Sequence, residues 1–215
     1  MGKGTLITRP NHDLATTYLF YWSKPLVEIA KNEGIQILDL AQKKASLGTL
    51  SSYIENRKPR FIFLNGHGGP DYVCGYDDEV IVNLDNCKEL LNGTIVYARS
   101  CESGLLLGPE CIKTGTLAFI GYSRKFIVGY LEEKQTRPLN DNVAKLFLEP
   151  SNLIALYIMR GNSVKIACEK ARSLMIRNFT YMLSRSASSD EKDAAVYLWS
   201  NIKHLVTWGN TEAKV

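Results

Sequence analysis

Several features that would assign a chain to a membrane or to nucleic acid are missing from this sequence. Among its 215 residues, charged side chains interrupt every apolar run well before the length that a membrane-spanning helix needs. The 26 Lys and Arg residues and the 22 Asp and Glu residues are spread along the chain, and the net charge is only +4. No run of basic residues has the character of a nucleic-acid-binding arm. We therefore expect no membrane and no nucleic acid among the partners of this protein.

Cysteine is scarce, and its pattern excludes two common roles. The five cysteines are an odd number and include no Cys-x-x-Cys pair, which argues against a disulfide framework and against a zinc knuckle. The first residues lead directly into a predicted strand and not into a secretory apolar segment. We therefore expect a cytoplasmic protein.

Motifs for nucleotides and for metals are lacking as well. No P-loop and no Gly-x-Gly-x-x-Gly follows any predicted strand, so nucleotide binding has no support. The acidic stretch Asp77, Asp78 and Glu79 lacks the spacing of an EF-hand loop, and we interpret it as the solvated tip of a hairpin. We expect no cofactor and no bound metal.

What the sequence does contain is an alternation of short apolar strands and amphipathic helices. This alternation implies right-handed βαβ crossovers and a mostly parallel sheet of about six strands in an α/β fold, a three-layer αβα sandwich. Without a repeat or a linker, one domain over residues 1–215 is the simplest organisation. The predicted strands are residues 5–8, 35–40, 60–64, 94–98 and 116–121, and the predicted helices are residues 14–31, 49–56, 85–91, 163–183 and 190–203.

Other parts of the chain depart from this alternation. We predict a small hairpin at residues 71–82, two short helices at residues 142–148 and 153–159, and a last edge strand at residues 205–208. Residues 123–142 are charged and include a proline, which predicts a long loop. Long loops inside compact domains are usually functional or mobile, so we expect this one to border the active site.

A histidine and a cysteine each follow an apolar strand. His67 comes shortly after strand 60–64 and is followed by Gly68, and Cys101 comes shortly after strand 94–98. Because the carboxyl ends of parallel strands share one edge of a sheet, an imidazole base and a thiol nucleophile would meet there. The backbone N–H groups of Gly68 and Cys101 could together bind an oxyanion. The parts needed for acyl transfer are therefore present.

Two more residues could approach the same edge. His12 and Asp13 follow the first predicted strand and directly precede the first predicted helix. Aspartate is a favoured residue at a helix N-terminus, so we interpret Asp13 as the N-cap.

With these residues in place, the sequence resembles the caspase-like cysteine peptidases, a group that includes caspases, metacaspases, legumains, gingipains, separases and the bacterial CHAT-type peptidases. The resemblance lies in residues 61–69, which carry the His-Gly pair, and in residues 95–104, which carry Cys-x-Ser-Gly. Residues 114–121, 161–172 and 205–210 are similar to further segments of bacterial members, although Asn and Thr replace the Asp and Pro of the gingipain-like ending.

The resemblance implies a cysteine endopeptidase that acts on a protein or peptide substrate. Cys101 would attack the scissile carbonyl, and His67 would protonate the leaving amine. In this family the two groups are often not in tight contact in the resting enzyme. The alternative is a catalytically silent module of the same fold that binds peptides or serves as a scaffold. The resemblance leaves open both a regulatory subunit and the oligomeric state.

The resemblance also gives a substrate-binding role to two arginines. The residue two before the cysteine lines the S1 pocket in several of these families, and here it is Arg99. Arg9 lies where caspases and legumain place a pocket arginine. A guanidinium in that pocket would favour an acidic P1 residue through a bidentate pair. The alternative is that one or both arginines pair with Asp13, Glu102 or another carboxylate of the protein itself.

Overall fold

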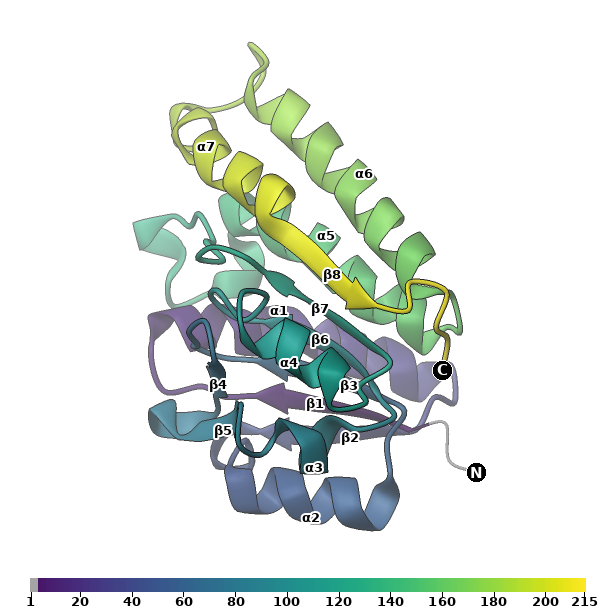
Figure 1. The fold of residues 1–215 in the computed structure, drawn as a ribbon. Coiled ribbons are helices and arrows are strands. Elements are labelled where there is room, and N and C mark those ends of the chain that lie inside the picture. The colour runs from purple at the N-terminus through teal and green to yellow at the C-terminus, as the bar shows by residue number, and fades with distance from the viewer. Residues whose placement is uncertain (1–3) are drawn as a thin grey trace.

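A six-stranded sheet forms the centre of the computed structural model, which describes residues 4–215 (Figure 1). The strand order is β2-β1-β3-β6-β7-β8. The first five of these run parallel, and β8 pairs antiparallel with β7 at the edge, as expected of a mostly parallel sheet. The strands are β1 (Thr5–Arg9), β2 (Ile37–Ala41), β3 (Phe61–Asn65), β6 (Ile95–Arg99), β7 (Ala118–Tyr122) and β8 (Leu205–Gly209).

The inner strands are apolar along most of their length because both faces of the sheet are covered. Every residue of β1, β3, β6 and β7 is buried. Strands covered on both faces have near-continuous apolar sequences in place of the alternation of half-exposed strands. Polar residues in these strands occur mainly near their carboxyl ends, where Asn65 ends β3 and Arg99 ends β6.

Two layers of helices complete the sandwich. One face of the sheet packs on α1 (Leu14–Asn32), α5 (Asn142–Met159) and α6 (Val164–Met182). The other face packs on α2 (Leu47–Arg57), α3 (Cys87–Leu91), α4 (Leu107–Lys113) and the hairpin of β4 (Tyr72–Cys74) and β5 (Val80–Asn83). The helix α7 (Ser189–His204) packs on α5 and α6 over a separate apolar cluster. The predicted three-layer αβα sandwich and hairpin are thus present.

Side-chain caps fix where several of these helices begin. The carboxylate of Asp13 accepts a hydrogen bond from the Thr16 N–H, which confirms its predicted role as the N-cap of α1. Ser163 and Ser188 cap α6 and α7 in the same way. Each cap satisfies an N–H group that has no partner inside its own helix.

Two helices differ from the sequence-based prediction. Residues 142–159 form one helix and not two, although Pro150 lies inside it. Pro150 is itself buried, and packing of the helix on α1 and α6 outweighs the hydrogen bond that a proline removes. The short helix α4 was not predicted because Gly108 and Pro109 weaken its helical pattern; its proline lies in the first turn, where the missing N–H costs little.

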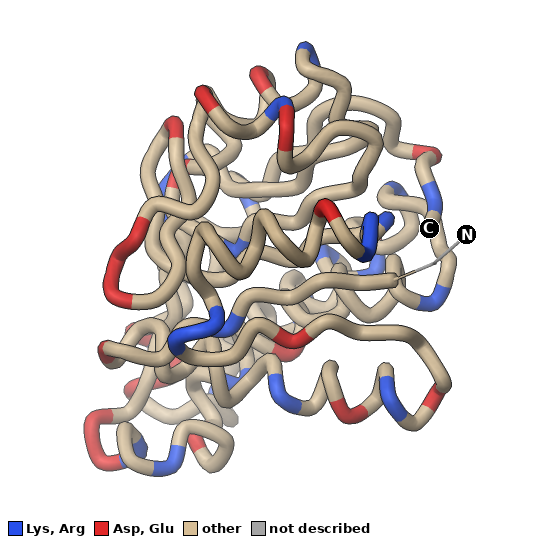
Figure 2. Tube along the Cα trace, turned by 90° about the horizontal axis from the view of Figure 1, so that it is seen from below, with Lys and Arg blue, Asp and Glu red and all other residues tan. Residues whose placement is uncertain are grey.

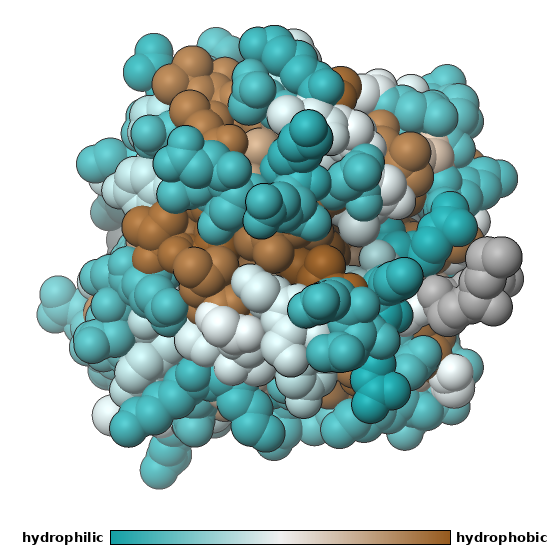
Figure 3. Space-filling view, turned by 60° about the horizontal axis from the view of Figure 1, so that its bottom comes forward, coloured by the Kyte–Doolittle hydropathy of each residue, from teal (hydrophilic) through white to brown (hydrophobic). Residues whose placement is uncertain are grey.

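Figure 2 shows Lys and Arg interspersed with Asp and Glu along the trace of the described residues. Figure 3 shows a band of hydrophobic residues across the middle of one face, bordered by hydrophilic ones. In residues 4–215, no helix is both long and apolar enough to cross a membrane.

Candidate active site

His67 and Cys101 lie at the same height on the carboxyl edge of the sheet. The last residues of β3 and β6 are paired, Asn65 with Arg99, so each candidate follows its strand by two residues. Both residues line one cavity of about 470 Å³. The structure therefore brings the two groups to one site, as the strand pattern predicts.

The two strand-end loops are held against each other. Ser100 Oγ donates a hydrogen bond of 2.9 Å to the His67 carbonyl. Gly68 makes this approach possible because a Cβ at that position would lie 2.0 Å from Ser100 Oγ and 2.7 Å from the Tyr72 carbonyl oxygen. Glycine is thus required at residue 68 by space.

The cysteine lies on a sharp turn after β6. Glu102, the next residue, has a φ of 56°, in the left-handed region that non-glycine residues rarely adopt. The Glu102 N–H is fixed by a hydrogen bond of 3.1 Å to the Arg124 carbonyl. A left-handed φ raises the energy of the backbone, and contacts such as this hydrogen bond hold the residue in place. The turn projects the Cys101 side chain toward the cavity that Cys101 lines.

The Cys101 thiol is half-buried and protonated at neutral pH. Its Sγ faces the Phe126 carbonyl oxygen at 3.8 Å. Burial raises the pKa of the thiol, and nearby Glu102 adds to this effect, while the Phe126 contact and Lys125 act in the opposite direction. Among the described residues, no hydrogen bond joins His67 to the thiol.

Asp13 orients the histidine. Its Oδ2 lies 2.5 Å from His67 Nε2, while its Oδ1 accepts from the Thr16 N–H at 2.8 Å. Burial alone would raise the pKa of the Asp13 carboxyl, but the hydrogen bonds from Thr16 and the contact with His67 outweigh it and lower that pKa. One carboxylate therefore caps α1 and fixes the imidazole. The sequence signal for the second role was its position just after a strand that ends at the same edge.

Two backbone N–H groups at this edge are available to an oxyanion. Within residues 4–215, neither the Gly68 N–H nor the Cys101 N–H donates a hydrogen bond to the protein. Both residues are partly exposed, so these N–H groups can bind water or a ligand. They are the same two groups that the sequence suggested for this purpose.

The cavity walls are largely apolar and come from three elements. The start of α1 supplies one wall, the two strand-end loops supply the reactive groups, and residues 123–142 supply the third side, as expected for a loop that borders the site. The apolar and aromatic lining consists of Leu14, Tyr18, Leu19, Phe126, Val128 and Tyr130.

Arg99 lines the cavity and is completely buried. Its guanidinium donates to Asn65 Oδ1 at 2.8 Å, Asn152 Oδ1 at 2.8 Å and Ser23 Oγ at 2.9 Å, with a longer contact to Ser151 Oγ. Burial lowers the pKa of Arg99 to about 10, so it stays charged at neutral pH. Among the described residues no carboxylate contacts it, and its partners are these neutral acceptors and the Phe63 ring, whose centroid lies 5.0 Å from the guanidinium carbon.

Arg9 has a different environment. Its Nε and Nη2 bind the two carboxylate oxygens of Asp39 at 2.7 and 2.6 Å, and its Nη1 donates to the Phe20 carbonyl. Arg9 does not line the cavity. It has the internal carboxylate partner that the sequence left as the alternative, so the structure does not place the two arginines in one pocket.

No protein-family model and no curated protein matches this chain, so we compare it with solved structures. A chain of the Saccharomyces cerevisiae separase–securin complex aligns with a TM-score of 0.54 and 15% identity over 97% of this chain and 12% of its own length. The Arg specific cysteine proteinase gingipain R aligns with a TM-score of 0.54 and 10% identity over 99% of this chain and 47% of its own. A secreted C11 cysteine protease from Bacteroides thetaiotaomicron aligns with a TM-score of 0.52 and 9% identity over 89% and 63%.

These similarities define the class of fold. The chain has the caspase-like fold, in which the central sheet is mostly parallel and helices cover both of its faces. The chain spans less than two thirds of the length of each of these three proteins. At these identities the similarity concerns fold, and the chemistry rests on the residues at the sheet edge.

Proposed function

We propose that this protein is a cysteine endopeptidase with Cys101 as nucleophile and His67 as acid and base. The observation that carries the proposal is that the Cys101 thiol and the His67 imidazole line one cavity, with the unpaired N–H groups of Cys101 and of Gly68, the residue after His67, at the same sheet edge. The Asp13–His67 contact supports it, since a carboxylate that holds an imidazole fixes the tautomer and orientation needed for proton transfer.

The proposed reaction begins with a protonated thiol. As the substrate carbonyl enters, His67 takes the Cys101 proton and Sγ bonds to the carbonyl carbon. The N–H groups of Gly68 and Cys101 stabilise the negative oxygen of the tetrahedral intermediate. The C–N bond then breaks while the imidazolium gives its proton to the leaving amine. Water, deprotonated by His67, attacks the thioester and releases the acid with the free thiol.

Labelling of the thiol tests this proposal before any substrate is known. Cys101 should react with iodoacetamide ahead of Cys74, Cys87 and Cys111, which are buried. The rate should rise with pH, because burial raises the pKa of the Cys101 thiol and the thiolate is the reactive form. Cys168 is the matched control, since it too is half-buried. Equal labelling of Cys101 and Cys168, or peptide turnover that survives in Cys101→Ala, would reject the proposed nucleophile.

We further propose an acidic preference at P1, supported by Arg99. A buried cation without a carboxylate partner makes the neighbouring cavity favourable for an anion. Arg9 contributes nothing to this preference because Asp39 already neutralises it. A positional P1 library with Cys101→Ala as the control measures the preference. A profile dominated by Leu, Lys or Arg would mean that the apolar walls decide and that Arg99 is structural.

The alternative function, a silent peptide-binding or scaffold module, predicts a different result in the same assays. Such a module would bind peptides in the cavity and leave them intact, and Cys101→Ala would bind as tightly as the wild type. We also propose that the protein works in the cytoplasm, supported by five cysteines that are all free in the described structure.

A further inference from the structure

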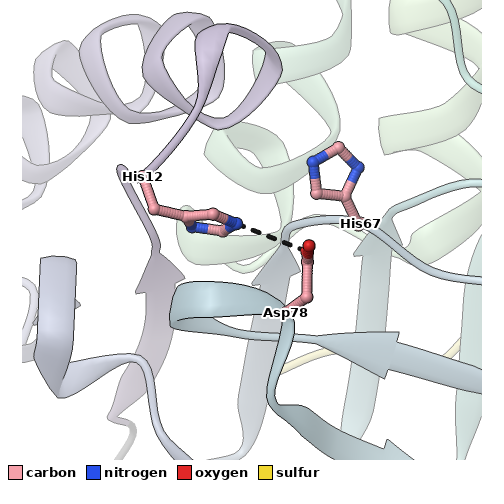
Figure 4. Close-up of side chains that lie close together, drawn as sticks. All are labelled: His12, His67 and Asp78. Carbon is pink, nitrogen blue, oxygen red and sulfur yellow. Dashed lines mark hydrogen bonds and ion pairs between the residues drawn. The ribbon is translucent and has the colours of Figure 1, made fainter.

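A cluster of three ligand-type side chains includes His67 and extends from it toward His12, just before α1, and Asp78 (Figure 4). His12, His67 and Asp78 each offer one nitrogen or oxygen atom, and these atoms lie within 4.8 Å of one another. They come from three separate segments: the end of β1, the loop after β3 and the short turn Tyr76–Asp78 between β4 and β5. Nothing in the linear spacing of residues 12, 67 and 78 predicts that they meet.

The distances suit a small tetrahedral cation. His12 Nε2 lies 3.3 Å from Asp78 Oδ1. Two ligands that each bind Zn²⁺ at about 2.0–2.1 Å are held roughly 3.3 Å apart across a tetrahedral ion. The His12–Asp78 pair already has this separation. No other pair has to close by more than about 1.5 Å, since all three atoms lie within 4.8 Å of one another.

The donor types select the metal. Two imidazole nitrogens and one carboxylate oxygen suit Zn²⁺, whereas Ca²⁺ and Mg²⁺ prefer oxygen ligands throughout. The Asp78 side chain is 65% exposed, so an ion can enter from solvent. His12 is largely buried, and its Nδ1 has no hydrogen-bond partner among the described residues. Because the Asp78 carboxylate can only accept, a neutral His12 carries its proton on Nε2 in this contact, and the unpartnered Nδ1 can take that proton when Nε2 binds an ion.

We propose that His12, His67 and Asp78 bind Zn²⁺ reversibly, and that the bound ion withdraws the His67 imidazole from catalysis. An imidazole with one nitrogen on zinc cannot become an imidazolium, so it has no proton to give to a leaving amine. Asp13, which contacts His67 Nε2, would be released or drawn toward the ion. The binding site stands on its own geometry, whereas the inhibition rests on the proposed peptidase function.

Calorimetric titration with ZnCl₂ tests the site directly. The starting protein is Cys101→Ala, which removes the thiol as a competing ligand. We expect one Zn²⁺ per chain, and at least tenfold weaker binding when His12→Ala or Asp78→Asn is added. Two matched controls should bind as the starting protein does: Asp77→Asn, which removes a neighbouring charge, and His204→Ala, which removes the remaining histidine. His204 lies elsewhere, with its Nδ1 on Ser123 Oγ.

The role of His67 has its own measurement. Zn²⁺ should protect His67, and not His204, from acylation by diethyl pyrocarbonate, as read by peptide mass spectrometry. In the protein that retains Cys101, Zn²⁺ should stop peptide turnover, EDTA should restore it, and His12→Ala should resist inhibition. Zinc binding unchanged in both His12→Ala and Asp78→Asn, or no protection of His67, would overturn the site. Zinc binding and protection without peptide turnover at any zinc level would uphold the site and reject the peptidase instead.

Discussion

The carboxyl edge of the sheet has two regions that treat their polar groups in opposite ways. At the end of β1, Arg9 forms a bidentate ion pair with Asp39 of the neighbouring strand β2, donates to the Phe20 carbonyl and stacks over the Phe20 ring. At the end of β3 and β6, Arg99 is buried without a carboxylate, and the Cys101 thiol has only a long contact to a carbonyl.

The difference separates groups that have internal partners from groups that have few. An arginine with its own carboxylate has nothing left to offer a ligand, whereas a cation balanced only by dipoles favours an anion that enters. The same holds for the two backbone N–H groups without acceptors at the β3–β6 end. Incompletely paired groups gathered at one place are the basis for the proposed binding of a substrate at this end of the sheet.

Among the replacements that test this comparison, His67→Ala should have the largest effect on the rate. His67→Ala should lower kcat by about 100-fold or more, the usual contribution of a positioned acid and base. His204→Ala is the control, because it removes an imidazole that lies outside the cavity. Steady-state kinetics on a cleaved peptide, with circular dichroism to confirm folding, provide the measurement. An unchanged kcat in His67→Ala would remove the histidine from the mechanism.

The sequence predicted that His67 and Cys101 meet, but it did not predict most of the contacts around them. His67 and Cys101 could be found because each follows a buried apolar strand, and strand ends share an edge. The pairing of Asp13 with His67 could not be predicted in this way. An aspartate just before a helix is already accounted for as an N-cap, and here one carboxylate makes both contacts. The Arg9–Asp39 pair forms because β1 and β2 are parallel neighbours in one register, and no local sequence pattern predicts that register.

The helices also show that local sequence patterns do not predict effects of tertiary packing. The pattern around Pro150 predicts a break, and tertiary packing overrides it. The cluster of His12, His67 and Asp78 could not be predicted from the sequence, because its residues come from three separate segments that meet only in the folded protein. Strand-end chemistry can thus be predicted locally, whereas partners supplied by other segments require the three-dimensional structure.

Replacing Arg99 should change specificity by the next largest amount. In Arg99→Gln, the ratio of kcat/KM for Glu to that for Leu at P1 should fall by about 10- to 100-fold, the worth of one or two charged hydrogen bonds. A ratio taken within one variant does not depend on the fraction of folded protein, which matters because Asn65 and Asn152 lose a partner. A ratio equal to the wild-type value would assign Arg99 to structure alone.

Replacing Asp13 should have a smaller effect on rate. Asp13→Asn keeps an oxygen that can cap α1 but weakens the hold on His67 Nε2, so kcat should fall by at least about tenfold with little loss of stability. Asp13→Ala should show the same fall in kcat and an added loss of about 1 kcal/mol from the missing cap. Urea unfolding beside kinetics separates the two roles. Full activity in Asp13→Asn would leave Asp13 as a cap only.

Replacing Arg9 should have the smallest effect, confined to stability. Arg9→Met leaves Asp39 without its partner, so the free energy of unfolding should drop by about 1–3 kcal/mol, while the Glu-to-Leu ratio at P1 stays at the wild-type value. Asp39→Asn should lower stability too, and the double variant should lose less than the sum of the two, because the pair acts as one unit. A change in P1 preference in Arg9→Met would mean that both regions of the edge contact the substrate.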